Sequence, residues 1–196
     1  LSGHIDQSFA VEIFSGSAGL SKALIRAGLA SIPIDHKHNR FTSKVAPFEL
    51  DITAHSGQST LWKILSSEHV VYVHLSPPCG TASRARERPI SNAARAKGWP
   101  EPPPLRSEEF PLGLPDLAVR SPHEVTRVRK ANTLYMLTSE ICTYLSHRQV
   151  PWTLENPARS YAWVLPPMLR LTASRGVCMH VPRFCVYGMR RGRSAP

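Results

Sequence analysis

The chain has few cysteines and no long apolar run. Its four cysteines are too few and too unevenly spaced for a disulfide framework, so free thiols in a reducing compartment are expected. No apolar stretch approaches the roughly 20 residues of a membrane span, and the opening LSGHIDQSFA lacks the charged start and apolar centre of a secretory signal. We therefore expect an intracellular protein with no membrane partner, placed in the nucleus if its source is eukaryotic.

Acidic residues are also scarce. The 14 Asp and Glu residues stand against 24 Lys and Arg, which gives a formal net charge of +10. This imbalance favours polyanionic partners such as nucleic acid or an anionic membrane surface, and charge alone does not choose between them. A hydrophobic content of 42% in 196 residues suits one domain with a real core, and we expect a monomer.

Both ends of the sequence resemble cut ends. The chain opens on Leu1 rather than Met, and it stops in MRRGRSAP directly after an expected strand. We expect an excerpt of a longer protein.

Strand-like and helix-like segments alternate along the chain. Strands are predicted at 9–14, 30–35, 69–75, 150–155, 176–181 and 183–188, and helices at 19–30, 60–68 and from Glu124 to about His147. This alternation predicts an α/β fold with an open, largely parallel sheet and helices on both faces. In such sheets ligands bind beyond the carboxyl ends of the strands, where the polar residues of interest fall.

A proline-rich segment interrupts the pattern. Eight prolines occur from Pro89 to Pro122 without a convincing period, which predicts an insertion or long loop. The single domain, 1–196, is therefore expected to comprise a first half at about 8–75, a loop at 76–88, the insertion at about 89–122 and a second half at 123–190.

The turn 14-FSGSAGL-20 is the first candidate site. Small residues between a strand and a helix allow a ligand to approach the backbone at the helix N-terminus, which suits nucleotide-like cofactors. A tight turn that needs glycine only for packing is the alternative. Asp35, at the end of the next strand, can accept hydrogen bonds from ribose hydroxyls. Asp51 can accept from an adenine amino group or, alternatively, cap a following turn.

Cys79 is the second candidate. It follows Pro77 and Pro78 in 76-SPPC-79, beyond an expected strand rather than inside it. An inert core thiol is the alternative to a nucleophile. Arg84 and Arg86 are expected to lower the pKa of the thiol by favouring the thiolate, which is how a cysteine nucleophile is activated.

Glu155 is the third candidate. It ends the expected strand 150-VPWTLE-155 and precedes Asn156-Pro157, a turn sequence. Its carboxyl is expected to face the same cleft as Cys79, where a general acid near a thiolate forms a catalytic pair. An ion pair with Arg159 is the alternative.

The ordered set FSGSAG, Asp35, Asp51, SPPC and ENP resembles the cytosine-C5 DNA methyltransferases, which use S-adenosylmethionine. The resemblance spans roughly residues 10 to 190, and its specific part covers about twenty of them. It implies a Rossmann-like methyltransferase fold, DNA as partner, and attack of a cysteine on C6 of a flipped cytosine whose N3 meets a glutamate.

The resemblance also assigns roles to residues. Cys79 becomes the nucleophile, Glu155 the N3 partner and Asn156 a support of the Pro77-Pro78 turn. The residues implied for DNA contact are Ser83, Arg84 and Arg86. The residues implied for the cofactor pocket are Phe14, Gly16, Ser17, Gly19, Leu20, Asp35, Asp51, Ile52 and Pro78.

The sequence departs from the family in several places. Ala18 stands where the family usually has glycine, and the loop GTASRAR lacks the usual aromatic residue. The arginine that helps to stabilise the cytosine O2 is assigned to Arg183, with Arg175 as the alternative. Nothing follows Pro196, so the family's target-recognition region is absent from this sequence. No metal is expected, because C-x-H-x4-C at Cys178 to Cys185 lacks a fourth ligand.

Two other functions are compatible with these patterns. One is a catalytically inactive, nucleic-acid-binding remnant of a methyltransferase. The other is an S-adenosylmethionine methyltransferase that acts on another substrate, such as an amino group. That class uses an Asn/Asp-Pro-Pro-aromatic turn, and the Ser-Pro-Pro-Cys turn here has no aromatic residue to stack on a flipped base.

Overall fold

A five-stranded, all-parallel sheet forms the centre of the fold, with strand order β3-β2-β1-β4-β5. The computed structural model describes residues 7–181. The strands are β1 (Phe9–Ile13), β2 (Ala30–Asp35), β3 (Phe48–Glu49), β4 (Val70–Leu75) and β5 (Trp152–Leu154). The helices are α1 (Gly19–Arg26), α2 (His55–Leu65), α3 (Asn92–Ala96), α4 (Leu117–Arg120), α5 (Pro122–His147) and α6 (Pro166–Thr172), with 3-10 turns η1 (Arg84–Glu87) and η2 (Tyr161–Val164).

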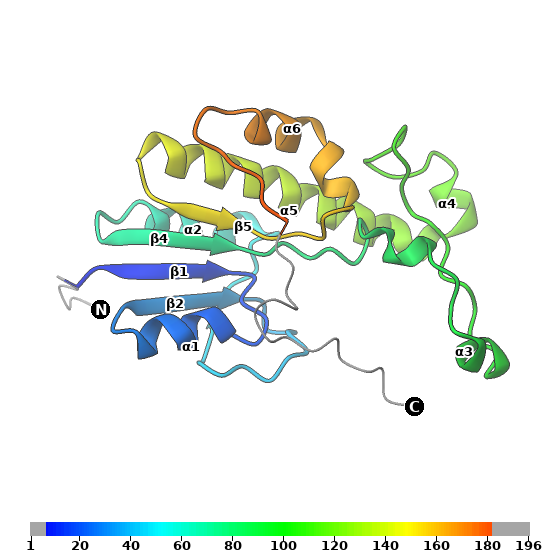
Figure 1. The fold of residues 1–196 in the computed structure, drawn as a ribbon, viewed down its shortest axis with the longest axis horizontal. Coiled ribbons are helices and arrows are strands. Elements are labelled where there is room, and N and C mark those ends of the chain that lie inside the picture. The colour runs from blue at the N-terminus through cyan, green and yellow to red at the C-terminus, as the bar shows by residue number, and fades with distance from the viewer. Residues whose placement is uncertain (1–6, 182–196) are drawn as a thin grey trace.

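Helices lie on both faces of the sheet (Figure 1). Helix α1 packs on β1 and β2 on one face, whereas α2 and α5 lie against each other on the other face, where the rings of Trp62 and Tyr144 meet edge to face at 5.2 Å. On one side of β1 lie β2 and then β3. The chain then returns to the other side of β1, where it forms β4 and β5. In open parallel sheets this reversal, here between β1 and β4, creates the crevice in which ligands bind. The fold thus places the loops after β1 and β4 on either side of that crevice.

The burial of the central strands explains why the sequence predicts them. Every residue of β1 is buried, and β4 contributes the fully buried Val73 and Leu75. Strands in the middle of a parallel sheet read as mostly apolar runs, as 9–14 and 69–75 do. Helix α5 adds Tyr135, Ile141 and Cys142 to the same cluster. Burial raises the pKa of Cys142 to about 12, so this thiol is an inert core residue.

Several elements differ from the sequence-based prediction. Helix α2 begins at His55 rather than at residue 60, and the two-residue strand β3 and helix α6 were not predicted. The strand expected at 176–181 is wrong: this segment forms no ladder, and Val177 N–H donates to the Ser174 carbonyl in a turn. Its alternating apolar residues have no neighbouring strand to pair with among the described residues. The strand expected at 183–188 lies outside them.

The proline-rich insertion also contains structure that its sequence did not indicate. It carries α3 and α4, and its residues Leu105 and Leu117 pack with Val128 of α5 in a small separate hydrophobic cluster. Arg106 is buried with 2% exposure. The segment 89–122, predicted as an insertion or long loop, therefore contains two short helices, and packing on α5 orders its part around Leu105, Arg106 and Leu117.

Gly57 makes the tightest backbone contact in α2. A Cβ at this position would lie 2.0 Å from the carbonyl oxygen of Asp51. We expect Gly57→Ala to lower the free energy of unfolding by about 1–3 kcal/mol, although alanine favours a helix interior by about 1 kcal/mol. Urea denaturation measures the change, with Ser59→Ala at an exposed position of the same helix as control. A Gly57→Ala protein as stable as the wild type would contradict this packing.

Candidate functional site

The turn after β1 is strained. Phe14, Gly16 and Ala18 all adopt left-handed backbone conformations, with φ of 61°, 53° and 51°. Only glycine adopts this region without cost, and strained residues of this kind cluster at ligand sites. Ala18 therefore occupies a position where glycine is the easier residue. The Ser76 hydroxyl after β4 donates to the Phe14 carbonyl at 3.0 Å and ties the turn to the neighbouring strand.

This strain leads to a paired prediction. A Cβ at Gly16 would meet only Phe41 Cδ2, at 3.7 Å, so Gly16→Ala is expected to cost about 1–2 kcal/mol through its backbone alone. Ala18→Gly should stay within about 1 kcal/mol of the wild type, because relieved strain offsets the lost methyl burial. Chemical denaturation of both variants measures the difference. Equal stability of Gly16→Ala and wild type would mean that the turn is not left-handed.

Asp35 holds this turn. Its Oδ2 accepts a hydrogen bond from the Gly16 N–H at 2.7 Å, and its Oδ1 accepts from the His36 N–H at 2.8 Å. Its side chain is only 9% exposed. Each carboxylate oxygen keeps a further lone pair, so Asp35 can still accept a hydrogen bond from a ribose hydroxyl. That bond remains a prediction. The structure adds that Asp35 positions the turn itself.

The segment between β2 and β3 covers the same turn. The amide of Asn39 and the hydroxyl of Ser43 both donate to the Gly16 carbonyl, and Lys44 N–H donates to the Ser17 carbonyl at 2.8 Å. The ammonium of Lys44 lies 3.8 Å from the position that a Cβ of Gly19 would take. Sequence reasoning missed these residues because they belong to no motif and approach the turn only through the loop.

One buried polar group beside the turn has no partner. Ser15 is 6% exposed, and its hydroxyl makes no hydrogen bond within the described residues. Leu20 and Ser17 are partly exposed at the start of α1, close to it in the chain. An orphaned buried hydroxyl next to a strained, glycine-containing turn fits a polar ligand that would satisfy it.

Asp51 behaves as its alternative interpretation predicts. Its Oδ1 accepts from both the N–H and the hydroxyl of Thr53, at 3.0 and 2.6 Å, and so caps the turn before α2. These hydrogen bonds lower the pKa of Asp51. Its side chain is exposed and remains open to a ligand, whereas Ile52 is buried.

The loop that carries Cys79 is held at several points. Asn156 donates its amide N–H to the Pro77 carbonyl at 3.0 Å, which agrees with the supporting role that the resemblance implies. Tyr135 of α5 donates its hydroxyl to the Pro78 carbonyl at 2.7 Å. The Cys79 carbonyl accepts from Ser83 N–H at 2.8 Å, which closes the following turn. These bonds leave Cys79 half-buried and Pro78 exposed at the end of β4.

A buried arginine fixes the next part of the loop. Arg106 donates to the carbonyl and hydroxyl of Thr81, at 3.1 and 3.0 Å, and to the Asn132 side chain of α5 at 2.7 Å. Its guanidinium also lies 5.8 Å from the centre of the Tyr135 ring. The insertion thus clamps the Cys79 loop onto α5. Sequence reasoning missed Arg106 because it lies in a proline-rich stretch with no period.

Cys79 and Glu155 interact electrostatically. Partial burial and then the negative charge of Glu155 raise the pKa of the Cys79 thiol above its usual 9.0. The Glu155 residue is exposed, but protein atoms partly surround its carboxyl. This partial loss of water raises the pKa of the carboxyl above 4.5. Its N–H donates to the Leu75 carbonyl, which places it beside the end of β4. The expectation that Arg84 and Arg86 lower the thiol pKa is wrong.

The reason lies in the partners of these arginines. Arg84 pairs with Glu108 and stacks over the Tyr161 ring at 4.6 Å, and Arg86 pairs with Glu124 at 3.2 Å. The Ser83 hydroxyl accepts from Ala85 N–H and caps η1. All three predicted DNA contacts are therefore engaged within the chain. Phosphate binding by them stays a prediction that requires these contacts to rearrange.

Helix α5 brings other cations to the same edge of the sheet. Arg127 pairs with Glu124 at 2.7 Å, and its Nη2 lies 4.0 Å from the position that a Cβ of Gly80 would take. Lys130 is near enough to Asp51 to help lower the pKa of that carboxyl. The first turns of α5 thus border the crevice.

The structure places only one of the two candidate arginines for the cytosine O2. Arg183 lies outside the described residues, so its role stays a prediction. Arg175 is exposed in the irregular segment after α6. Cys178 is a free, exposed thiol, and residues 7–181 contain no group of His, Cys, Asp or Glu side chains arranged to hold a metal ion.

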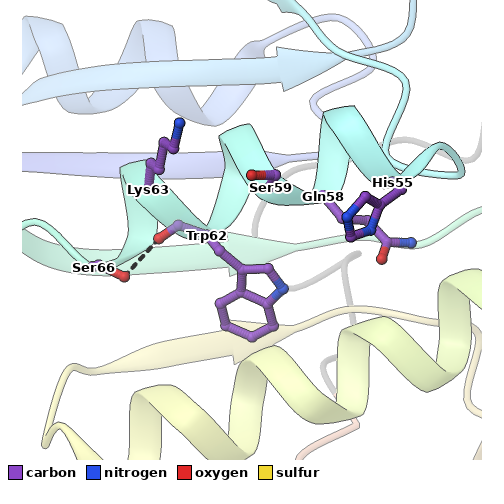
Figure 2. Close-up of a pocket in the computed structure, with 6 residues that line it drawn as sticks. All are labelled: His55, Gln58, Ser59, Trp62, Lys63 and Ser66. Carbon is purple, nitrogen blue, oxygen red and sulfur yellow. Dashed lines mark hydrogen bonds between the residues drawn. The ribbon is translucent and has the colours of Figure 1, made fainter.

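An open pocket lies apart from these residues. It has a volume of about 640 Å³ along α2 and is lined by His55, Gln58, Ser59, Trp62, Lys63 and Ser66 (Figure 2). None of the predicted site residues lines it. The pocket is therefore not the site that the motifs indicate, and the crevice between β1 and β4 remains the candidate.

Comparison of the chain with known protein families, with curated proteins and with solved structures finds no match. Between residues 7 and 181, no helix combines the length and apolar character needed to cross a membrane. The assignment of function thus depends on the motifs and on the geometry of the crevice.

Proposed function

We propose that the chain is the catalytic core of an S-adenosylmethionine-dependent DNA cytosine-C5 methyltransferase with a Rossmann-like methyltransferase fold. The observation that carries the proposal is the placement of Glu155, whose N–H donates to the Leu75 carbonyl at 2.8 Å, at the end of the strand that leads into the Cys79 loop. The two residues follow adjacent parallel strands whose carboxyl ends meet at one edge of the sheet. Attack on a pyrimidine ring needs a thiol and a carboxyl that both reach the ring, and this placement brings the two groups to the same edge of the sheet.

The cofactor is expected in the turn after β1. Gly16, Gly19 and the orphaned Ser15 hydroxyl would face it, and Asp35 would keep the turn in shape. Bound there, S-adenosylmethionine supplies an electrophilic methyl group. Lys44, next to Gly19, offers a positive charge for the carboxylate of the amino-acid part of the cofactor.

The shared proton of the pair explains its proposed role. Between their two raised pKa values, Cys79 and Glu155 together hold one proton. With that proton on Glu155, the Cys79 thiolate can form a bond to C6 of cytosine while Glu155 donates to N3. The electron pair of the C5–C6 double bond then becomes available at C5, where it would bond to the methyl group as the bond from that methyl group to the sulfonium sulfur breaks. Loss of the C5 proton to a base restores the double bond and expels the Cys79 thiolate, while the N3 proton returns to Glu155, so both side chains recover their starting states.

The proposal is tested with a DNA duplex that contains 5-fluorocytosine. Fluorine at C5 cannot leave as a proton, so the Cys79–C6 bond is expected to persist after methyl transfer and to survive denaturing electrophoresis. Peptide mass spectrometry should place the adduct on the peptide that contains Cys79. A duplex with ordinary cytosine is the control and should give no lasting adduct. If the natural full-length protein with cofactor forms no adduct, the chain is not a cytosine-C5 methyltransferase.

The same assay addresses the two alternatives. A protein that binds DNA without forming an adduct would be the inactive remnant. A protein that transfers methyl groups without an adduct would be a methyltransferase for another substrate.

A further inference from the structure

The insertion contains a projecting arm, residues 88–100. Helix α3 stands beyond the carboxyl ends of the strands, apart from the sheet (Figure 1). Every residue from Ser91 to Pro100 except Ala94 is exposed. The Trp99 residue is 62% exposed. Tryptophan is enriched at interfaces, because its ring supplies apolar contact area while its N–H stays polar, so this exposed side chain marks a candidate binding surface.

The arm is folded rather than irregular. The Ser91 hydroxyl caps α3 by accepting from Ala94 N–H at 3.2 Å, and Trp99 N–H donates to the Ala94 carbonyl at 3.1 Å. Gly98 has a φ of 71°, the left-handed conformation that ends a helix. Glu101 closes the base of the arm by accepting from Ile90 N–H at 3.1 Å. Trp99 is thus presented from a defined turn, at a low cost in conformational entropy.

The charge of the arm has one sign. Arg88, Arg95 and Lys97 lie in it, and no acidic residue occurs between Glu87 and Glu101. Arg95 is paired with Glu101, while Arg88 and Lys97 are exposed. Cations bind backbone phosphates, and an exposed indole stacks on bases or sugars, so this combination fits a nucleic acid.

The arm is also fixed relative to Cys79. It follows η1 directly in the chain, and η1 follows the Cys79 loop. Arg86 of η1 forms an ion pair with Glu124 of α5. At its other end, Arg106 is buried against Thr81 of the same loop. A partner bound by the arm is therefore held at a set position beside the candidate nucleophile.

We propose that the 88–100 arm binds DNA next to the target base, with Trp99 stacking on a nucleotide and Arg88 and Lys97 contacting phosphates. This assignment takes its partner from the proposed function and gives the insertion the role of a DNA-recognition element. It differs from the motif-based prediction, in which Arg84 and Arg86 make these contacts.

The test measures binding of a labelled DNA duplex by fluorescence anisotropy, without cofactor. Trp99→Ala is expected to weaken binding by about 5- to 100-fold. Arg88→Ala and Lys97→Ala should each lower the slope of log K against log salt by about 0.9. Leu169→Ala and Arg170→Ala remove an exposed apolar residue and an exposed cation of α6, and should leave binding unchanged. Circular dichroism checks that each variant is folded, as expected for exposed positions.

The adduct assay separates this inference from the function on which it rests. Unchanged DNA binding in Trp99→Ala and Lys97→Ala overturns the arm proposal, even if the 5-fluorocytosine adduct forms. Weakened binding without any wild-type adduct supports the arm and rejects the methyltransferase. Preferential displacement of the duplex by a matched RNA, or no binding of DNA by the wild type, also overturns the proposal.

Discussion

Cys79→Ala is expected to abolish methyl transfer to DNA, with kcat at least about 10⁴-fold below the wild type. Without the thiolate, no bond to C6 forms and C5 stays too weak a nucleophile. Cys142 cannot substitute for it, since its thiol is buried with a pKa of about 12. Transfer of a radiolabelled methyl group from S-adenosylmethionine to duplex DNA measures the loss.

Two controls accompany this variant. Cys178→Ser changes an exposed thiol and should retain full transfer. DNA binding by Cys79→Ala should stay within a few-fold of the wild type, because the loop is held by Asn156 and Tyr135 through backbone carbonyls. Residual transfer within about tenfold of the wild type would exclude Cys79 as the nucleophile.

Glu155→Gln is expected to change two measurements in opposite directions. Methyl transfer should fall by about 10²- to 10⁴-fold, because glutamine cannot deliver a proton to N3. The pKa of Cys79 should fall, because the charge of Glu155 is the second cause of its elevation, after burial. Alkylation by iodoacetamide at neutral pH should therefore become faster in the variant whose methyl transfer is slower.

The alkylation is best followed with Cys178 and Cys185 replaced by serine, so that Cys79 is the reactive thiol. Glu140→Gln, an exposed position of α5, is the matched control and should change neither measurement. A slower or unchanged alkylation in Glu155→Gln would mean that the two side chains do not interact.

The pH dependence of the wild type follows from the same pair. As pH falls through the Glu155 pKa, which lies above 4.5, both groups become protonated and the thiolate is lost. As pH rises through the Cys79 pKa, which lies above 9.0, both groups lose their protons and none remains for N3. The rate of methyl transfer is therefore expected to be bell-shaped, and Glu155→Gln should lose the acid limb set by Glu155.

The basic character of the chain is distributed in an unexpected way. Several arginines near the crevice are paired with acids, including Arg84, Arg86 and Arg127. The charges within such pairs cancel, so the net charge of +10 must come from cations elsewhere in the chain. The exposed Arg88 and Lys97 of the arm, together with Lys130 of α5, are therefore the better candidates for DNA contact.

The sequence by itself determined the strands β1, β2 and β4, the long helix α5 and the order of the motifs along them. These elements have strong local signals: short, mostly apolar runs for the parallel strands, and a sustained apolar period for the helix. The same signals placed Gly16, Asp35, Cys79 and Glu155 at or just beyond the ends of strands. A rule about parallel sheets then predicted that they share one edge.

Only the tertiary structure decided what surrounds those residues. The two-residue β3 and the clamp of Arg106 on Thr81 have no local signal, because both depend on contacts with segments far away in the chain. Arg84 and Arg86 were expected to activate Cys79, but Glu108 and Glu124 of distant segments take up their charges. A pKa depends on burial and on neighbouring charges in space. The sequence could therefore name Cys79 and Glu155, while the direction of their pKa shifts required the folded chain.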